Sequence, residues 1–234
     1  MINEFTIIVP ARLASTRLPN KVLADINGEA MIVCVLRRAA GAGAARVLAA
    51  TDSEVVAEVC RAAGFEARII GECNSGSDRV AAAADDCGLD DDAIVVNLQG
   101  DEPFIEAHLA HDVADLLANR RDCCCATIAR PLRPGEHEDN NVVKVVADGN
   151  NNALYFSRAA MATAQAHLGV YAYRMSFLRR FVALPPSPQE KAEKLEQLRI
   201  LWHGEKIALL SAESKSFGID TPDDLSRARM IKNN

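Results

Sequence analysis

The chain has 234 residues, enough for one domain with a large core or for one domain that carries a small lobe. With 49% hydrophobic and 25% charged residues, its composition is that of an ordinary globular protein. The formal net charge of −6 argues against a nucleic-acid surface, so a site for an anionic ligand must gather positive charge locally.

Cysteine usage and the N-terminus favour a cytoplasmic protein. The seven cysteines are odd in number, three of them are consecutive, and none forms a CxxC pair, so we expect reduced thiols rather than a disulfide framework or a zinc ribbon. The first five residues show no signal-peptide pattern. No apolar stretch is long enough to span a bilayer, so we expect no membrane insertion.

The first half of the chain alternates strand and helix patterns. Short apolar runs predict strands at 5–9, 46–51, 65–70 and 93–98. The segments between them predict helices at 31–45, 53–63 and 78–87. Repeated strand–helix units of this kind indicate a parallel sheet with helices on both faces.

The second half has a different character. Strands are predicted at 123–129, 142–147, 154–157, 167–173 and 206–211, and one helix is predicted at 189–202. A last helix begins at Thr221 as N-cap with Pro222 at its first position. Because there is no internal repeat and no long linker, we expect one domain over 1–234 with a small lobe at roughly 130–185.

The loop after the first predicted strand gathers positive charge. It carries Arg12, Arg17 and Lys21 without an acidic residue, and small residues such as Ser15 leave backbone amides free. Because ligands of open parallel sheets bind beyond the carboxyl ends of the strands, this composition favours a polyphosphate. The loop is neither a GxxxxGK[ST] nor a GxGxxG motif, and the alternative is a solvated basic loop.

Two aspartates follow predicted strand ends. Asp101 comes after the strand at 93–98 and behind a glycine, and Asp220 lies in Gly218-Ile219-Asp220-Thr221-Pro222. Carboxylates in this position can share Mg²⁺ in phosphoryl or nucleotidyl transfer. The alternative is that they are turn or N-cap residues. The segment 74–79 offers amides and small side chains that suit a base edge, or a capped helix start.

Together these residues resemble the CMP-Kdo synthetases, which are 3-deoxy-manno-octulosonate cytidylyltransferases. The resemblance runs nearly end to end. Its motifs are at 9–12, 15–21, 50–52, 75–79, 97–103, 142–145, 153–158, 167–171, 195–199 and 218–222. The first motif is shared with other sugar nucleotidyltransferases, whereas Glu196-Gln197-Leu198-Arg199 and the segment 218–222 narrow the resemblance to this family.

The resemblance implies a fold and an activity. The fold is a Rossmann-like α/β nucleotidyltransferase sandwich with a mostly parallel central sheet and a smaller inserted β-rich lobe for dimerisation and sugar contacts. The implied enzyme is a cytoplasmic homodimer that uses Mg²⁺. It would transfer CMP from CTP to Kdo, releasing pyrophosphate and giving CMP-Kdo for lipopolysaccharide synthesis.

The resemblance also assigns roles to residues. Those implied in catalysis are Arg12, Lys21, Asp101 and Asp220, of which the two aspartates bind Mg²⁺ and the two cations hold the triphosphate. Those implied in substrate binding are Ser15 beside the triphosphate, Ser77 and Arg79 near the cytosine, and Arg17, Gln99, His167, Glu196 and Gln197 toward the sugar.

The chain departs from the family pattern at 159–166, which is short, Ala-rich and uncharged where the family has a longer insertion. Two alternatives to a Kdo enzyme therefore stay open. One is a CMP-sialate synthetase or another sugar cytidylyltransferase, against which Glu196-Gln197 argues. The other is a non-catalytic nucleotide-binding paralogue, against which Asp101 and Asp220 argue, because a scaffold needs neither.

Overall fold

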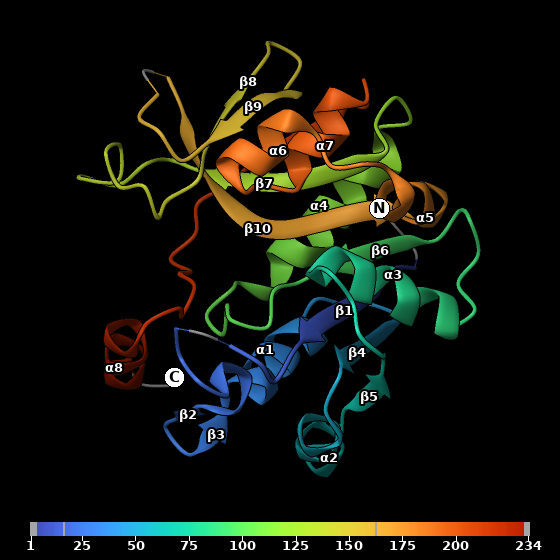
Figure 1. Ribbon diagram of the computed structural model, residues 1–234, viewed down its shortest axis with the longest axis vertical. Helices are drawn as coiled ribbons and strands as arrows, with labels where there is room; N and C mark the ends of the chain where they lie inside the picture. The colour runs from blue at the N-terminus through green and yellow to red at the C-terminus, as the bar shows by residue number, and fades with distance from the viewer. Residues whose placement is uncertain (1–3, 16, 162, 232–234) are drawn as a thin grey trace.

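A mixed β-sheet runs through the molecule and carries helices on both faces (Figure 1). The computed structural model describes residues 4–15, 17–161 and 163–231. The nine-stranded sheet has the order β11-β7-β10-β6-β1-β4-β5, and β8 and β9 branch from β10. Its strands are β1 (Thr6–Ala11), β4 (Arg46–Thr51), β5 (Glu66–Ile69), β6 (Ile94–Asn97), β7 (Cys125–Arg130), β8 (Lys144–Ala147), β9 (Ala153–Ser157), β10 (Gln165–Arg174) and β11 (Ile207–Ser211).

The helices and a small hairpin complete the fold. The helices are α1 (Met31–Ala40), α2 (Glu54–Ala62), α3 (Gly76–Asp86), α4 (Ala107–Asn119), α5 (Met175–Ala183), α6 (Pro188–Glu193), α7 (Gln197–Trp202) and α8 (Pro222–Met230). A 3₁₀ helix η1 (Lys21–Leu23) precedes the hairpin of β2 (Asp25–Ile26) and β3 (Glu29–Ala30). No helix in the described part of the chain is long and apolar enough to cross a membrane.

The central part of the sheet is parallel, as predicted. β1 pairs in parallel with β4 and β6, and β4 pairs in parallel with β5. In this register Ala11 lies opposite Thr51, and Ile8 lies opposite Asn97. The carboxyl ends of β1, β4 and β6 therefore meet at one edge, which brings together loops that are far apart in the chain.

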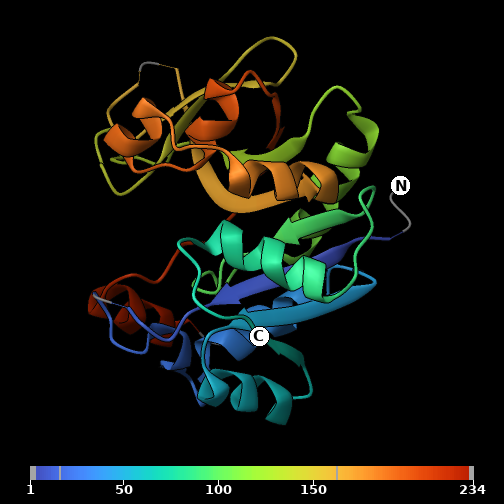
Figure 2. The same ribbon diagram turned by 45° about the vertical axis from the view of Figure 1, so that its right-hand side comes forward.

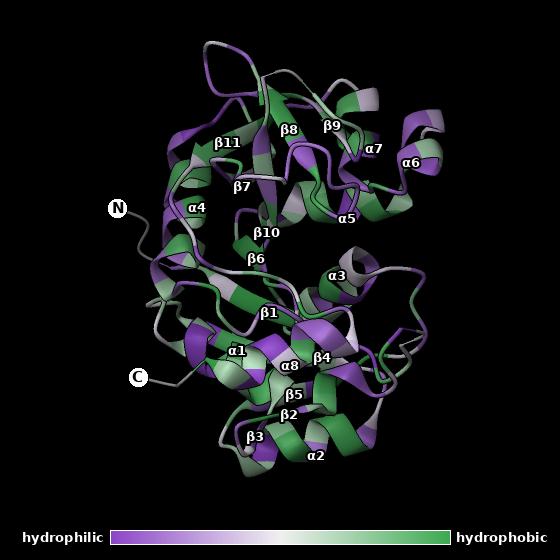
Figure 3. Ribbon diagram, turned by 90° about the vertical axis from the view of Figure 1, so that its left-hand side faces the viewer, coloured by the Kyte–Doolittle hydropathy of each residue, from purple (hydrophilic) through white to green (hydrophobic). Residues whose placement is uncertain are grey.

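Alternation along the strands builds two cores. Ile7 packs in a cluster with residues of α1, α2 and α4, whereas the next residue, Ile8, packs in a cluster with residues of α3, α5 and α7. Successive side chains of a strand point to opposite faces, so one apolar run supplies both cores. Figure 2 shows α3 and α5 in front of the sheet. In Figure 3 the central strands are hydrophobic, whereas α8 is largely hydrophilic.

Two strands of the second half, β9 and β10, run in the opposite direction to β1, whereas β7, β8 and β11 run in the same direction. β10 is antiparallel to β6, β7 and β8, and β8 forms a hairpin with β9. These strands confirm the strand predictions at 142–147, 154–157 and 167–173. The predicted division into one domain with a lobe at roughly 130–185 stays a prediction.

The single helix predicted at 189–202 is wrong. Two short helices, α6 and α7, occupy this range, and Lys194 between them adopts a left-handed conformation with φ 57°. Such a residue cannot continue a right-handed helix. The break leaves Glu196 at the N-cap of α7, so its carboxylate is not on a continuous solvated face.

Other helix predictions differ from the structure in extent. The helix predicted at 31–45 ends at Ala40, where the turn through Gly41 and the left-handed Gly43 lead into β4. Helix α5 was not predicted, because it begins directly after β10 without a turn signal, although its apolar residues Phe177, Leu178 and Phe181 are buried. The predicted start of the last helix is confirmed by the capping box of Thr221 and Asp224.

An extended segment from β11 to α8 crosses the carboxyl edge of the sheet (Figure 1). The hydroxyl of Ser216 donates to the Glu102 carboxylate over 3.0 Å, and the backbone N–H of Ile219 donates to the carbonyl of Asp101 over 2.9 Å. These bonds attach the segment to the loop after β6. They place Asp220 next to Asp101, although the two residues lie in different halves of the chain.

Gly100 allows the loop after β6 to pass close to the end of β1. A Cβ atom at this position would lie 2.8 Å from the carbonyl oxygen of Pro10, which is backbone and cannot move away cheaply. We therefore expect Gly100→Ala to lower the free energy of unfolding by about 1–3 kcal/mol, as measured by urea denaturation.

The matched control for this variant is Gly149→Ala, where a Cβ would meet nothing within 4 Å. Equal stability of the two variants would show that the close approach at Gly100 does not constrain the fold.

Candidate active site

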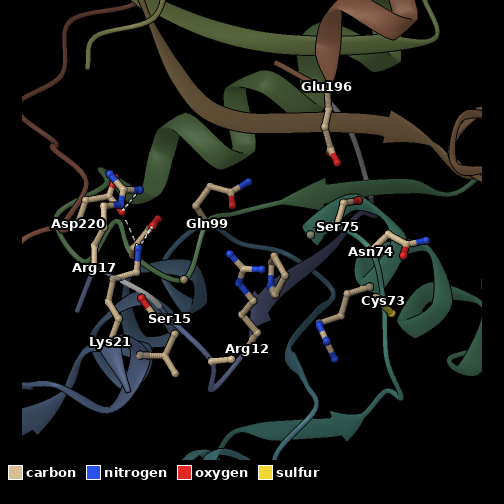
Figure 4. Close-up of a pocket in the computed structure, with 17 residues that line it drawn as sticks. Arg12, Ser15, Arg17, Lys21, Cys73, Asn74, Ser75, Gln99, Glu196 and Asp220 are labelled. Carbon is tan, nitrogen blue, oxygen red and sulfur yellow. Dashed lines mark hydrogen bonds and ion pairs between the residues drawn. The ribbon is translucent and has the colours of Figure 1, made fainter. Parts of the chain in front are cut away.

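A polar cavity of about 440 Å³ opens at the carboxyl edge of the sheet, between the loops that follow β1, β5 and β6 (Figure 4). This volume lies within the range of small-molecule sites. The residues that line it are Pro10, Arg12, Ala14, Ser15, Arg17, Lys21, Val22, Cys73, Asn74, Ser75, Gly76, Arg79, Gln99, Gly100, Asp101, Glu196 and Asp220.

The cavity is positive although the protein is negative. Its lining holds four cations, Arg12, Arg17, Lys21 and Arg79, against three carboxylates, a balance of 4 − 3 = +1, whereas the whole chain has a net charge of −6. Positive charge at one edge of an acidic protein favours an anionic ligand. The sequence predicted this concentration from the loop after the first strand.

Lys21 connects the two predicted metal ligands. Its ammonium donates to Asp101 over 2.6 Å and to Asp220 over 2.8 Å, and Arg17 lies 3.0 Å from the same oxygen of Asp220 (Figure 4). Burial by itself lowers the pKa of Lys21, but the two carboxylates outweigh burial and raise the pKa above its ordinary value. Lys21 is therefore a fixed positive charge.

Arg79 forms part of the cavity wall on α3 and is buried. Its guanidinium donates to the carbonyl of Ile70 over 2.8 Å and to the carboxylate of Asp52 over 3.1 Å. Ser75, the N-cap of α3, accepts the backbone N–H of Asp78. The segment 74–79 is thus the capped helix start that the sequence left open as one alternative, and it also lines the cavity, whereas its recognition of a base edge stays a prediction.

Glu196 reaches into the cavity from the side opposite Arg12 (Figure 4). The hydroxyl of Ser77 donates to its carboxylate over 2.8 Å, which joins α3 to the start of α7. Ser77 itself does not line the cavity, and Gln197 is buried at the start of α7. Gln99 lines the cavity, and its amide donates to Asn97 and to the carbonyl of Gly169.

His167 lies on β10 and outside the cavity lining. Its ring packs against Phe156 and Tyr171, and its Nε2 atom lies 2.9 Å from the hydroxyl oxygen of Thr127. Burial lowers the pKa of His167 from 6.5 to about 3. The imidazole is therefore neutral at physiological pH.

Two carboxylates that support the site were given no role from the sequence. Glu102 is buried beside Asp101, and burial, together with the charge of Asp101, raises its pKa to about 7. Asp52 contacts the loop after β1 and Arg79. Both residues lie in motifs that the sequence analysis singled out, at 97–103 and 50–52. The motif positions were the available signal, because side-chain partners are not visible in one sequence.

The seven cysteines are free thiols in the structure. Cys73 lines the cavity, and burial raises the pKa of its thiol. A thiol with a raised pKa is a poor nucleophile at neutral pH. The cavity therefore does not have the character of a site for covalent cysteine catalysis.

The depressed pKa of His167 predicts a pH dependence of stability. Below about pH 6.5 the imidazole of His167 is protonated in the unfolded chain but stays neutral in the folded protein. The free energy of unfolding therefore decreases as the pH falls from about 6.5 toward about 3. We expect His167→Gln to lose less free energy of unfolding than the wild type between about pH 7 and about pH 4.5. Urea denaturation at both pH values measures this difference.

His108→Gln, on the exposed surface of α4, is the matched control and should behave like the wild type. A wild type that loses no more stability than His167→Gln on acidification would contradict an imidazole that stays neutral in the folded protein.

Comparisons with known proteins agree with this site and fold. A cytidylyltransferase family model matches residues 6–207. A 3-deoxy-manno-octulosonate cytidylyltransferase of Leptothrix cholodnii is 50% identical, over 97% of this chain and 90% of its own length. One of Methylococcus capsulatus is 48% identical, over 97% and 96%.

A solved structure of CMP:2-keto-3-deoxy-manno-octonic acid synthetase complexed with CTP is 35% identical, with a TM-score of 0.91 and 97% of each chain covered. The matches therefore extend over nearly the whole length of this chain and of its relatives. They confirm the α/β nucleotidyltransferase fold and the enzyme class that the motifs predicted. The chain belongs to the cytidylyltransferase family and, within it, to the 3-deoxy-manno-octulosonate cytidylyltransferases.

Proposed function

We propose that this protein transfers CMP from CTP to Kdo, giving CMP-Kdo and pyrophosphate. The observation that carries the proposal is the cationic cavity, whose lining holds Arg12, Arg17 and Lys21 together with Asp101 and Asp220 at the carboxyl edge of the sheet. The relatives named for Kdo cytidylyl transfer and the similar structure complexed with CTP support the choice of substrates.

The reaction is an in-line displacement at phosphorus. The anomeric hydroxyl oxygen of Kdo bonds to the α-phosphorus of CTP, and the bond from that phosphorus to the bridging oxygen breaks. Pyrophosphate leaves with the electron pair, and the hydroxyl proton is released. Such a displacement needs alignment and neutralisation of negative charge more than a covalent nucleophile. Arg12 and Lys21 would supply charge to the triphosphate, with Ser15 beside them.

Mg²⁺ fits the donor set at the carboxyl edge. The carboxylates of Asp101 and Asp220 both accept from the ammonium of Lys21, so they lie close together. Two carboxylates with substrate phosphates are a usual ligand set for this ion. These two residues would hold the metal. When bound, it would neutralise charge on the phosphate oxygens. Lys21 lies between the same carboxylates and keeps them together without the ion.

The acceptor end of the cavity is formed by Glu196 and Gln99. We place Kdo there, with Gln197 and His167 supporting the wall from behind, and with Arg17 available to its carboxylate. Cytosine would lie against the segment 74–79, which contains Ser77 and Arg79. The bond from Ser77 to Glu196 connects these two ends, so the base side and the sugar side are coupled through one contact.

A substrate comparison tests the acceptor. Purified protein with CTP and Mg²⁺ should release pyrophosphate with Kdo and not with sialic acid, as measured by a coupled phosphate assay. Turnover with sialic acid alone would make the protein a CMP-sialate synthetase. CTP binding without turnover on either sugar would make it a non-catalytic paralogue.

The two aspartates have a separate test. We expect Asp101→Asn and Asp220→Asn each to lower kcat on the order of a hundredfold or more, because each removes a carboxylate that would hold the metal ion, and the metal ion would neutralise the negative charge of the transition state. Thermal unfolding of each variant checks that the fold is intact. Asp223→Asn, an exposed neighbour on α8, is the matched control. Unchanged kcat in both site variants would remove the metal assignment.

Assembly and location complete the proposal. We propose a homodimer that works in the cytoplasm and supplies lipopolysaccharide synthesis. Leu154 on β9 and Trp202 on α7 are 58% and 54% exposed, and their two elements contact one another. Exposed large apolar side chains are typical of subunit interfaces. The free thiols favour a reducing compartment.

A further inference from the structure

Asp52 lies at the end of β4, where it joins two walls of the cavity without lining the cavity itself. One carboxylate oxygen accepts the backbone N–H of Leu13 over 3.0 Å. The other accepts the guanidinium of Arg79 over 3.1 Å. A single side chain therefore contacts both the loop after β1 and the helix α3.

The contact with Leu13 acts on the cationic loop. Leu13 lies between Arg12 and Ala14 in the chain. Its neighbours Arg12, Ala14 and Ser15 line the cavity. The loop after β1 lies outside any regular helix or strand at this point, so it has no ladder of backbone bonds to hold it. Anchoring the amide of Leu13 restricts the directions in which Arg12 and Ser15 can point.

The contact with Arg79 acts on the opposite wall. Arg79 has only 4% of its surface exposed, and its second partner is the carbonyl of Ile70 at the end of β5. A buried guanidinium left without its carboxylate is costly and shifts to find another partner. Asp52 thus orients the Arg79 side chain in the cavity wall and balances its positive charge.

We infer that Asp52 is a positioning residue that holds the triphosphate loop and the Arg79 wall at the separation that CTP requires. This inference rests on the proposed function, because CTP is the ligand whose binding it concerns. The Kdo end of the cavity, at Glu196, receives no contact from Asp52 among the described residues. Asp52 therefore contacts the CTP end directly and is connected to the Kdo end only through α3, whose Ser77 donates to Glu196.

Two substitutions distinguish the contact of Asp52 with Leu13 from its contact with Arg79. Asp52→Ala removes both, whereas Asp52→Asn keeps an oxygen for Leu13 and loses the ion pair with Arg79. Isothermal titration calorimetry with CTP and Mg²⁺ measures the affinity of each. We expect Asp52→Ala to weaken CTP binding on the order of tenfold, which corresponds to about 1.4 kcal/mol, and Asp52→Asn to weaken it less. The KM for Kdo at saturating CTP should change little.

Glu54→Gln is the matched control, because Glu54 is a carboxylate two residues away whose partner, Arg61, is remote from the cavity. It should bind CTP like the wild type. If Asp52→Ala does not fold, Asp52→Asn decides the question by the same measurement.

The outcomes are distinct for the inference and for the proposed function. A wild type that binds no CTP would remove the proposed function and this inference with it. A wild type that binds CTP and folded Asp52 variants that bind it equally well would overturn the inference alone. If the Asp52 variants weaken CTP binding and raise the KM for Kdo by equal factors, and if their melting temperature also falls, the inference would likewise be overturned. Asp52 would then have a purely structural role.

Discussion

The ion-paired cluster of Lys21, Asp101 and Asp220 joins three segments that are distant in the chain. Lys21 follows the loop after β1, Asp101 follows β6, and Asp220 precedes α8. Two carboxylates this close repel one another unless a cation lies between them. The ammonium of Lys21 supplies that cation, so the edge of the sheet can hold negative ligand groups and negative side chains together.

The rest of the site depends on how the parallel strands end. The aligned ends of β1, β4 and β6 present Arg12, Asp52 and Asp101 along one edge, and Gly100 permits the close approach to Pro10. The segment before α8 is attached to the loop after β6 through Ser216 and Ile219. Backbone geometry therefore brings the site residues together, and ion pairs then hold their side chains. A rigid arrangement of this kind suits a reaction that depends on the alignment of its two substrates.

The division between predictable and unpredictable features follows the range of the interactions. Buried strands, the capped start at Thr221 and the cationic loop are local patterns, and the structure confirms them. The break at Lys194, the start of α5 and the end of α1 were not predicted, because each depends on packing or on a backbone conformation that residue type does not specify. The supporting roles of Asp52 and Glu102 also depend on contacts between residues that are far apart in the chain.

The sequence by itself determined the class of chemistry. Charge type and strand-end position, from Arg12 to Asp220, indicated phosphoryl or nucleotidyl transfer, and the resemblance of the motifs to a known family narrowed this chemistry to a cytidylyltransferase. Only the tertiary structure decided which of these side chains face one cavity. Lys21 forms ion pairs with both aspartates, and Glu196 accepts a hydrogen bond from Ser77. His167, in contrast, contacts Thr127 and does not line the cavity. These outcomes depend on long-range packing of the sheet, which no local pattern encodes.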